Sequence, residues 1–226
     1  MTVDLSCYLV TDSGQSAARG RALLDTVLAA IAGGVTTVQL REKTASARDF
    51  LELVTGVAAA APPHVSVLVN DRVDVFLAAR AQGAVVHGVH LGQSDLPPLL
   101  ARQLIGPDAL IGLSASTPDQ VTAAQRSAAR IDYVGIGAVH PTTSKADPPP
   151  ALGINRVVAL AQACGLPAVG IGGLTPADAP ALRAGGLAGA AVVSWICAAG
   201  DPRAAAAALR AAWDDGRPTD AEDGAA

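Results

Sequence analysis

Short hydrophobic runs alternate with longer amphipathic segments along nearly the whole chain. The short runs are rich in Val, Leu, Ile and Ala, and the segments between them place apolar residues three and four positions apart, as on one face of a helix. This alternation is typical of parallel sheets whose strands are joined by helices. We predict eight strands, at residues 7–11, 37–40, 65–69, 88–91, 110–113, 133–136, 168–171 and 189–193.

The segments between the predicted strands have the ends expected of helices. Three of them begin with a capping residue followed by proline at the first helical position, namely Thr117-Pro118, Thr175-Pro176 and Asp201-Pro202. Eight strand–helix units in 226 residues favour a single (β/α)8 TIM barrel, of the α/β class, over an open doubly wound sheet. The open sheet is the structural alternative.

Composition agrees with one domain. A chain of 226 residues, 50% of them hydrophobic, can build one barrel-sized core but not two ordinary enzyme domains. We assign residues 1–213 to the barrel. Residues 214–226 are rich in Asp, Glu, Gly and Pro, so we expect them to form a disordered acidic tail.

Charge and cysteine content limit the partners and the compartment. The net charge of -4 gives no basic surface for nucleic acid, so we expect small-molecule partners. The 3 cysteines have neither metal-site nor disulfide spacing and are expected to be buried thiols. Neither a signal peptide nor a membrane span is recognisable, so we expect a cytoplasmic protein with no membrane partner. A homo-oligomer is compatible with the sequence.

Polar residues gather directly after the second predicted strand. Strand periodicity puts Gln39, Arg41 and Lys43 on one face, and Leu40 and Glu42 on the other. Because barrel enzymes carry their chemistry at the C-terminal ends of the strands, two cations are predicted at the barrel mouth. The alternative is a solvated turn in which Glu42 pairs with a cation.

Carboxylates follow the next two predicted strands. Asp71 stands in Asn70-Asp71-Arg72 after the third strand, and Asp95 follows the fourth. Two such groups can hold Mg²⁺, which keeps several waters and takes further ligands from substrate phosphates. Each aspartate alone is more often a turn or cap residue. Their placement after neighbouring strands favours the metal site.

Two regions near the end of the barrel could bind phosphate. Glycine-rich turns at the last two strands let backbone N–H groups surround an anion, although they also simply permit tight turns. The residues concerned are Gly172, Gly173, Val193 and Ser194. The long polar loop at 137–153 is typical of a lid or binding loop, or else of a solvated loop. Its hydroxyl-rich run ends in a cation: Thr142, Thr143, Ser144 and Lys145.

Hydroxyls also follow the fifth predicted strand, where Ser114 and Ser116 could orient a ligand or begin a helix. We assign no catalytic role to the 4 histidines, which are His64, His87, His90 and His140.

Taken together, these motifs resemble the thiamine-phosphate synthase family. The resemblance covers about residues 8–196 and depends on the order and spacing of six segments: YLVTD at 8–12, VQLREK at 38–43, VNDRVD at 69–74, GVHLGQSDLP at 88–97, YVGIGAVHPTTSK at 133–145 and VGIGGLTP at 169–176.

The resemblance implies a transferase of thiamine biosynthesis. Its substrates would be two phosphorylated small molecules, 4-amino-2-methyl-5-(diphosphooxymethyl)pyrimidine and thiazole phosphate, either 4-methyl-5-(2-phosphoethyl)thiazole or its carboxylated form. Its products would be thiamine phosphate and diphosphate. The resemblance also implies Mg²⁺ as cofactor and a dissociative mechanism, in which the C–O bond breaks before the thiazole nitrogen attacks.

The resemblance implies roles for individual residues. Those matching the pyrimidine diphosphate site are Gln39, Leu40, Arg41, Glu42, Lys43, Asn70, Ser114 and Lys145. Among them, the expected catalytic residues are Arg41, Lys43, Ser114 and Lys145. Those matching the thiazole phosphate site are Thr142, Thr143, Ser144, Gly173, Val193 and Ser194. Asp71 and Asp95 match the Mg²⁺ ligands.

Three features depart from the family pattern. Ser144 stands where threonine is common, which keeps the hydroxyl, and Ser116 stands where histidine is common. The segment at 82–87 is longer than expected and brings the register of the metal site into question. The competing functions are a thiazole tautomerase, a non-catalytic thiazole-phosphate-binding regulatory protein, and a phosphosugar isomerase or aldolase. The retained cations and carboxylates argue against the tautomerase, which needs no diphosphate pocket.

Overall fold

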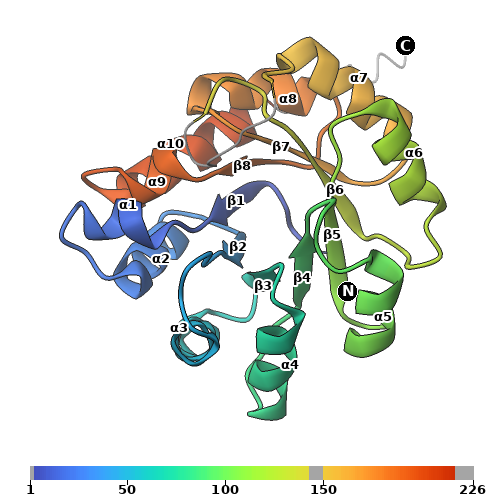
Figure 1. Ribbon diagram of the computed structural model, residues 1–226. Helices are drawn as coiled ribbons and strands as arrows, with labels where there is room; N and C mark the ends of the chain where they lie inside the picture. Colours follow the sequence, from blue (N-terminus) through green and yellow to red (C-terminus); the bar gives the residue numbers. More distant parts are fainter. Residues whose placement is uncertain (1–2, 143–149, 217–226) are drawn as a thin grey trace, which may run out of the picture.

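The computed structural model describes residues 3–142 and 150–216. Within this part of the chain, eight parallel strands close into a barrel, because each strand pairs with the next and β8 pairs with β1 (Figure 1). The fold is therefore a (β/α)8 barrel, as predicted. The strands are β1 (Cys7–Val10), β2 (Thr37–Leu40), β3 (Ser66–Asn70), β4 (Gly88–Leu91), β5 (Leu110–Ser114), β6 (Tyr133–Gly137), β7 (Ala168–Ile171) and β8 (Gly189–Val192).

The helices form an outer layer around the barrel (Figure 1). Two of them, α1 and α9, are short and lie beside each other where the chain leaves β1 and β8. The helices are α1 (Ser13–Ala17), α2 (Leu23–Ala32), α3 (Ala47–Ala60), α4 (Val73–Ala81), α5 (Pro98–Ile105), α6 (Pro118–Arg126), α7 (Ile154–Cys164), the 3-10 turn η1 (Pro176–Asp178), α8 (Ala179–Ala184), α9 (Ser194–Cys197) and α10 (Pro202–Asp215).

The predicted capping residues begin their helices through side-chain hydrogen bonds. Thr117 accepts from the backbone N–H of Gln120, and Asp201 accepts from those of Arg203 and Ala204. Each bond satisfies N–H groups that have no partner within the helix. The third predicted cap, Thr175, forms a reciprocal capping box with Asp178 and begins η1 rather than an α-helix.

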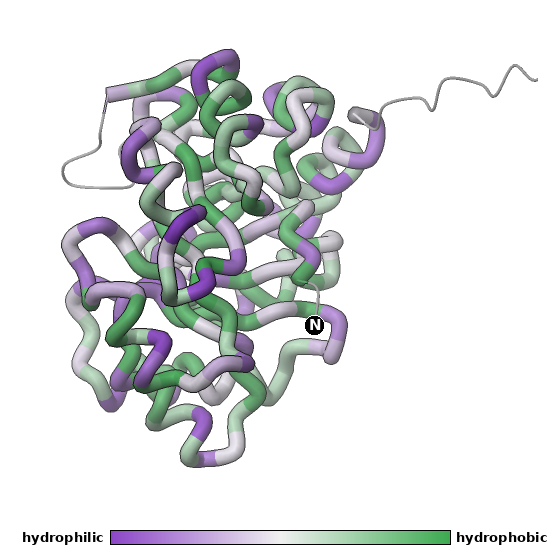
Figure 2. The backbone as a smooth tube through the Cα atoms, turned by 90° about the vertical axis from the view of Figure 1, so that its right-hand side faces the viewer, coloured by the Kyte–Doolittle hydropathy of each residue, from purple (hydrophilic) through white to green (hydrophobic). Residues whose placement is uncertain are grey.

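Strand alternation sorts the apolar residues into two layers. On β1, Cys7 and Leu9 face the helices, whereas Tyr8 and Val10 face the barrel interior. Hydrophobic and hydrophilic residues alternate along the outer helices (Figure 2). The buried apolar residues of these helices pack against those of the strands. Burying one large apolar side chain in this outer layer stabilises the fold by about 1.5–3 kcal/mol. The three cysteines are free and buried, as predicted.

The C-terminal helix reaches slightly beyond the expected domain boundary. The acidic tail was expected from residue 214 onward, but α10 includes Asp214 and Asp215. Asp214 pairs with Arg183 of the neighbouring helix α8, and with Arg210, which lies one turn before it in α10. Residues 217–226, the rest of the expected tail, lie outside the described residues. None of the helices described is both long and apolar enough to cross a membrane.

Candidate active site

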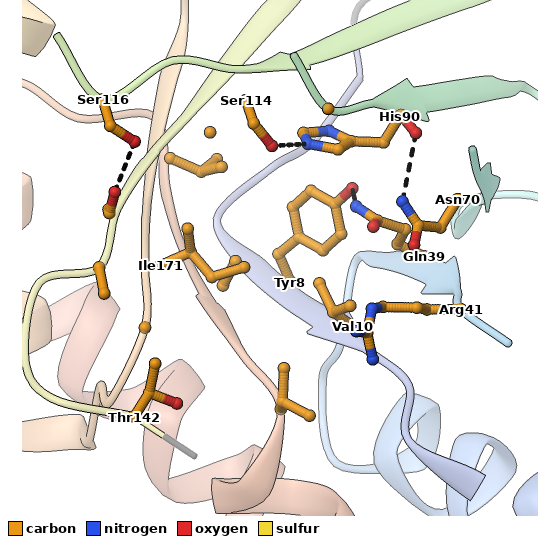
Figure 3. A pocket seen from close by; sticks show the side chains of 18 of the residues that line it. Tyr8, Val10, Gln39, Arg41, Asn70, His90, Ser114, Ser116, Thr142 and Ile171 are labelled. Carbon is orange, nitrogen blue, oxygen red and sulfur yellow. Dashed lines mark hydrogen bonds between the residues drawn. The ribbon is translucent and has the colours of Figure 1, made fainter. Parts of the chain in front are cut away.

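A cavity of about 690 Å³ opens at the C-terminal ends of the strands. Its lining comes from all eight strands or the loops that follow them (Figure 3). This volume is within the range of small-molecule sites, and the position is where barrel enzymes carry their chemistry. The predicted site residues can therefore be judged by whether they reach this cavity.

The end of β2 presents one face to the cavity. Gln39, Arg41 and Lys43 line it, as the strand alternation predicted. Leu40 is fully buried on the opposite side of the strand, and Glu42 accepts a hydrogen bond from the Ser13 hydroxyl at 3.0 Å. The structure therefore does not bring the side chains of Leu40 and Glu42 to the cavity with the other three.

Asp71 and Asp95 both line the cavity next to these cations. Asp71 has a left-handed backbone, with φ of 59°, which is uncommon for residues other than glycine. Its backbone N–H donates to His90 O at 2.9 Å, and its carboxylate accepts from Asn70 Nδ2 at 2.7 Å and pairs with Lys43. These contacts turn the carboxylate toward the cavity. Asp95 accepts from the Gly92 backbone N–H at 2.7 Å.

The two carboxylates form an electrostatically unfavourable pair. Burial raises the pKa of Asp71; Lys43 lowers it, Asp95 raises it, and the balance lies above the ordinary value. A divalent cation between the carboxylates would remove this repulsion, so the donor set fits Mg²⁺. The described residues contain no group of three or more His, Cys, Asp or Glu side chains that could hold a metal. Further Mg²⁺ ligands would therefore come from water and from substrate phosphate.

The opposite side of the cavity is formed by glycines and short loops. Gly172 and Gly173 have φ of 100° and 67°, and they line the cavity together with Val193 and Ser194. A Cβ atom at Gly172 would lie 2.7 Å from Ala138, so this glycine is also needed for the packing of β7 against the loop after β6. Gly172 thus both packs closely against Ala138 and exposes its backbone to the cavity.

The loop after β6 contributes Thr142 to the cavity. The remaining predicted residues of this loop, Thr143, Ser144 and Lys145, lie outside the described residues. Before them, His140 is fixed to the turn after β7, because its Nε2 lies 2.8 Å from Asp178 Oδ1. The base of the loop is therefore tied to η1.

Two departures from the family pattern have structural explanations. The segment at 82–87 follows α4 and leads into β4, where Asn70 pairs with His90 in regular parallel register, so it leaves Asp71 and Asp95 beside the cavity. The Ser116 hydroxyl donates to Gly137 O at 2.6 Å. It therefore joins β5 to β6 while lining the cavity.

The cavity also contains polar residues that were not predicted as site residues, among them Tyr8, His90 and Gln93. His90 contacts Ser114, with Nε2 and Oγ 3.0 Å apart, and Gln93 donates to the Ser114 carbonyl at 2.6 Å. Tyr8 and His90 occupy alternate strand positions that face the interior, and this alternation was the signal that could have identified them. Ser114, which was predicted, is thus supported from two sides.

The closed barrel and its charged cavity define a barrel enzyme that can bind anionic small molecules. Residues 7–196 match the family model described as thiamine monophosphate synthase. The chain is 42% identical to the thiamine-phosphate synthase of Corynebacterium efficiens, over 96% of this chain and 98% of that one. It is 47% identical to that of Xanthobacter autotrophicus, over 92% and 95%.

Among solved structures, the chain is similar to a thiamine phosphate pyrophosphorylase from Pyrococcus furiosus. The TM-score is 0.81 with 29% sequence identity, over 95% of this chain and 98% of that one. The chain therefore belongs to the thiamine-phosphate synthase family, and it is a transferase.

Proposed function

We propose that the protein couples 4-amino-2-methyl-5-(diphosphooxymethyl)pyrimidine to thiazole phosphate, giving thiamine phosphate and diphosphate in the cytoplasm. The observation that carries the proposal is the gathering of Arg41, Lys43, Asp71 and Asp95 on one side of a small-molecule cavity. Two cations and a carboxylate pair suited to Mg²⁺ match a diphosphate leaving group. The competing tautomerase and regulatory functions have no use for this arrangement.

The charged side of the cavity would stabilise the departing diphosphate. As the C–O bond breaks, negative charge grows on the diphosphate, and Arg41 and Lys43 are placed to offset it. Asp71 and Asp95 would hold Mg²⁺, which would supply further positive charge at the phosphate oxygens. Ser114 would donate a hydrogen bond from the neighbouring strand, and Gln39 would orient the pyrimidine ring. Lys145 is assigned to the same pocket from the sequence alone.

The glycine-lined side would receive the thiazole phosphate. Backbone groups around Gly173 and Ser194 are suited to a phosphate, because neutral N–H donors can surround it without repelling Mg²⁺. Thr142 would add a hydroxyl, with Thr143 and Ser144 assigned from the sequence. The thiazole nitrogen is itself the nucleophile, so the protein needs none. Catalysis then consists of positioning two substrates and offsetting charge.

The test is to incubate the protein with both substrates, with Mg²⁺ or with EDTA, and to follow thiamine phosphate and diphosphate by mass spectrometry. We expect both products only with Mg²⁺. Asp71→Asn keeps a residue that tolerates the left-handed backbone but removes the charge, so activity should fall roughly a hundredfold or more. Asp108→Asn, in an exposed loop outside the cavity, is the matched control and should change little.

A folded, Mg²⁺-supplied protein that forms neither product would refute the proposed coupling. In that case, isomerisation of the carboxylated thiazole would identify a tautomerase. Binding of thiazole phosphate without any turnover would identify a regulatory protein. Loss of activity in Lys145→Ala, with unchanged thermal unfolding, would support the role assigned to Lys145.

A further inference from the structure

Five side chains form a continuous hydrogen-bonded chain across the barrel interior, at the floor of the cavity. Gln39 Nε2 donates to Tyr8 Oη at 2.7 Å, and Tyr8 Oη lies 2.6 Å from Tyr133 Oη. Tyr133 Oη lies 2.9 Å from His90 Nδ1, and His90 Nε2 lies 3.0 Å from Ser114 Oγ. Figure 3 shows His90 between Ser114 and the Tyr8–Gln39 pair. The chain ends on a hydroxyl that the proposed function places against the diphosphate.

The barrel makes specific room for this chain. A Cβ atom at Gly112 would lie 2.2 Å from Tyr133 Cζ and 2.5 Å from His90 Nδ1, and one at Gly135 would lie 3.2 Å from His90 Cε1. Tyr8, Tyr133, Gln39 and His90 are all buried. Buried polar groups are unfavourable unless each is hydrogen-bonded, whereas apolar side chains usually fill a barrel interior. Such a set of polar side chains therefore calls for a role beyond packing.

The chain has a direction, which begins at Gln39. The Tyr8 hydroxyl accepts from the Gln39 amide nitrogen, so among its hydrogen-bond partners in the described residues only the Tyr133 oxygen can take the Tyr8 hydrogen. Tyr133, whose oxygen then accepts from Tyr8, gives its own hydrogen to its remaining acceptor, His90 Nδ1. Burial raises the pKa of both phenols well above the ordinary value, so both keep the proton that this arrangement requires. With Nδ1 as acceptor, neutral His90 carries its hydrogen on Nε2 and donates it to Ser114 Oγ.

We propose that His90 is a positioning residue for the coupling reaction, held as the Nε2–H tautomer so that the Ser114 hydroxyl donates into the cavity. The Ser114 oxygen accepts from His90, so its own hydrogen is directed toward an oxygen of the bound diphosphate. A hydroxyl fixed in this way needs no reorientation as the negative charge develops. The role of Ser114 rests on the proposed function, whereas the tautomer of His90 does not.

The tautomer can be measured without any substrate. Long-range ¹H–¹⁵N correlation spectra of the labelled protein distinguish protonated from unprotonated ring nitrogens. The His90 signals are those that disappear in His90→Gln. If His90→Gln does not fold, a variant in which the other three histidines are substituted leaves only the His90 signals. We expect hydrogen on Nε2 in the unaltered protein, and a mixture of tautomers in Tyr133→Phe, which keeps the ring but loses the donor. Hydrogen on Nδ1 in the unaltered protein would overturn the inference.

Kinetics of two substitutions at His90 test the consequence for catalysis. The glutamine in His90→Gln can place an amide nitrogen near the position of Nε2, whereas the shorter side chain in His90→Asn reaches only that of Nδ1. We expect kcat to fall roughly tenfold further in His90→Asn than in His90→Gln, with similar KM values. Adding Ser114→Ala to His90→Asn should cause little further loss, because the two residues act together.

Two results keep this inference separate from the proposed function. If the unaltered protein forms no thiamine phosphate, the proposed function fails, and the spectra still decide the tautomer. If it is active but His90→Gln and His90→Asn have equal kcat values, the positioning role of His90 fails alone. His64→Gln, an exposed histidine outside the cavity, is the control and should behave as the unaltered protein.

Discussion

The two sides of the cavity are built on different principles. The charged side, formed by Arg41, Lys43, Asn70, Asp71 and Asp95 after β2 to β4, presents side chains to the ligand. The glycine side, formed by Gly172, Gly173, Val193 and Ser194 after β7 and β8, presents mainly backbone. Both sides lie at strand ends of one closed barrel. They differ in whether side chains or backbone groups face the cavity.

Because of this difference, residues of the charged side should affect activity with little effect on stability, whereas residues of the glycine side should affect both. Within the described part of the chain, the Arg41 guanidinium has no hydrogen-bond or ion-pair partner, and Lys43 is 54% exposed. Neither cation belongs to the buried core, so we expect the fold to depend little on them. A Cβ atom at Gly173, in contrast, would lie 2.8 Å from both His140 Cβ and Pro141 O. We therefore expect substitutions to reduce activity alone on the charged side, and both activity and stability on the glycine side.

The largest effect is expected from Arg41→Met, which keeps much of the aliphatic length but removes the charge. Because one positioned donor to a developing anion is typically worth two to three orders of magnitude, kcat/KM for the pyrimidine diphosphate should fall roughly a hundredfold. Thermal unfolding should not change. Arg126→Met, the same charge change on an exposed turn of α6, should leave both quantities unaltered. A large loss of stability in Arg41→Met would break the proposed contrast.

Gly173→Ala should have a smaller effect, but one on both stability and ligand binding. The left-handed backbone and the close contacts with the loop after β6 should together lower the free energy of unfolding by about 2 kcal/mol. Displacement of that loop should also weaken thiazole phosphate binding roughly tenfold. Both can be measured, by chemical denaturation and by titration calorimetry.

Gly186→Ala provides the matched control. Gly186 has φ of 87° but no atom within 4 Å of a Cβ atom, so only the backbone term of about 1 kcal/mol applies, and ligand binding should not change. Equal behaviour of the two variants would show that the close packing of Gly173 has no functional consequence.

The contrast also explains which parts of the site could be predicted from the sequence. Period-two alternation placed Gln39, Arg41 and Lys43 on one face, and the strand bounds agreed within one residue, because both depend on local hydrophobic patterning. The roles assigned to these residues remain predictions. Leu40 and Glu42 belong to the same motif, but their side chains face away from the cavity.

The hydrogen-bonded chain under the cavity could not be predicted in the same way. Tyr8 and Tyr133 are 125 positions apart, and each looks like an ordinary member of an apolar strand. The sequence analysis assigned no role to His90, although its position in β4 faces the cavity. Their pairing depends on the closure of the barrel and on the space left by Gly112, neither of which is visible in a local pattern.

The smallest effect concerns the attachment of the glycine side. Asp178 is 13% exposed and lies 2.8 Å from His140 Nε2. Burial raises the pKa of Asp178, but hydrogen bonds from the Thr175 backbone N–H and from His140 lower it by more. The pKa therefore lies below its ordinary value. A carboxyl group with a lowered folded-state pKa contributes stability above its unfolded pKa of about 3.9, and this contribution is lost as pH falls below that value.

Asp178→Asn should therefore be less stable than the unaltered protein at pH 7, by about 1 kcal/mol or less, because His140 is 40% exposed and the pair is partly screened. The difference should shrink as the pH falls from about 5 toward 3, since the unaltered protein alone loses this contribution. Urea unfolding at a series of pH values measures it. A difference that stays constant with pH would show that Asp178 acts through its neutral hydrogen bonds, and that charge plays no part in holding the loop after β6.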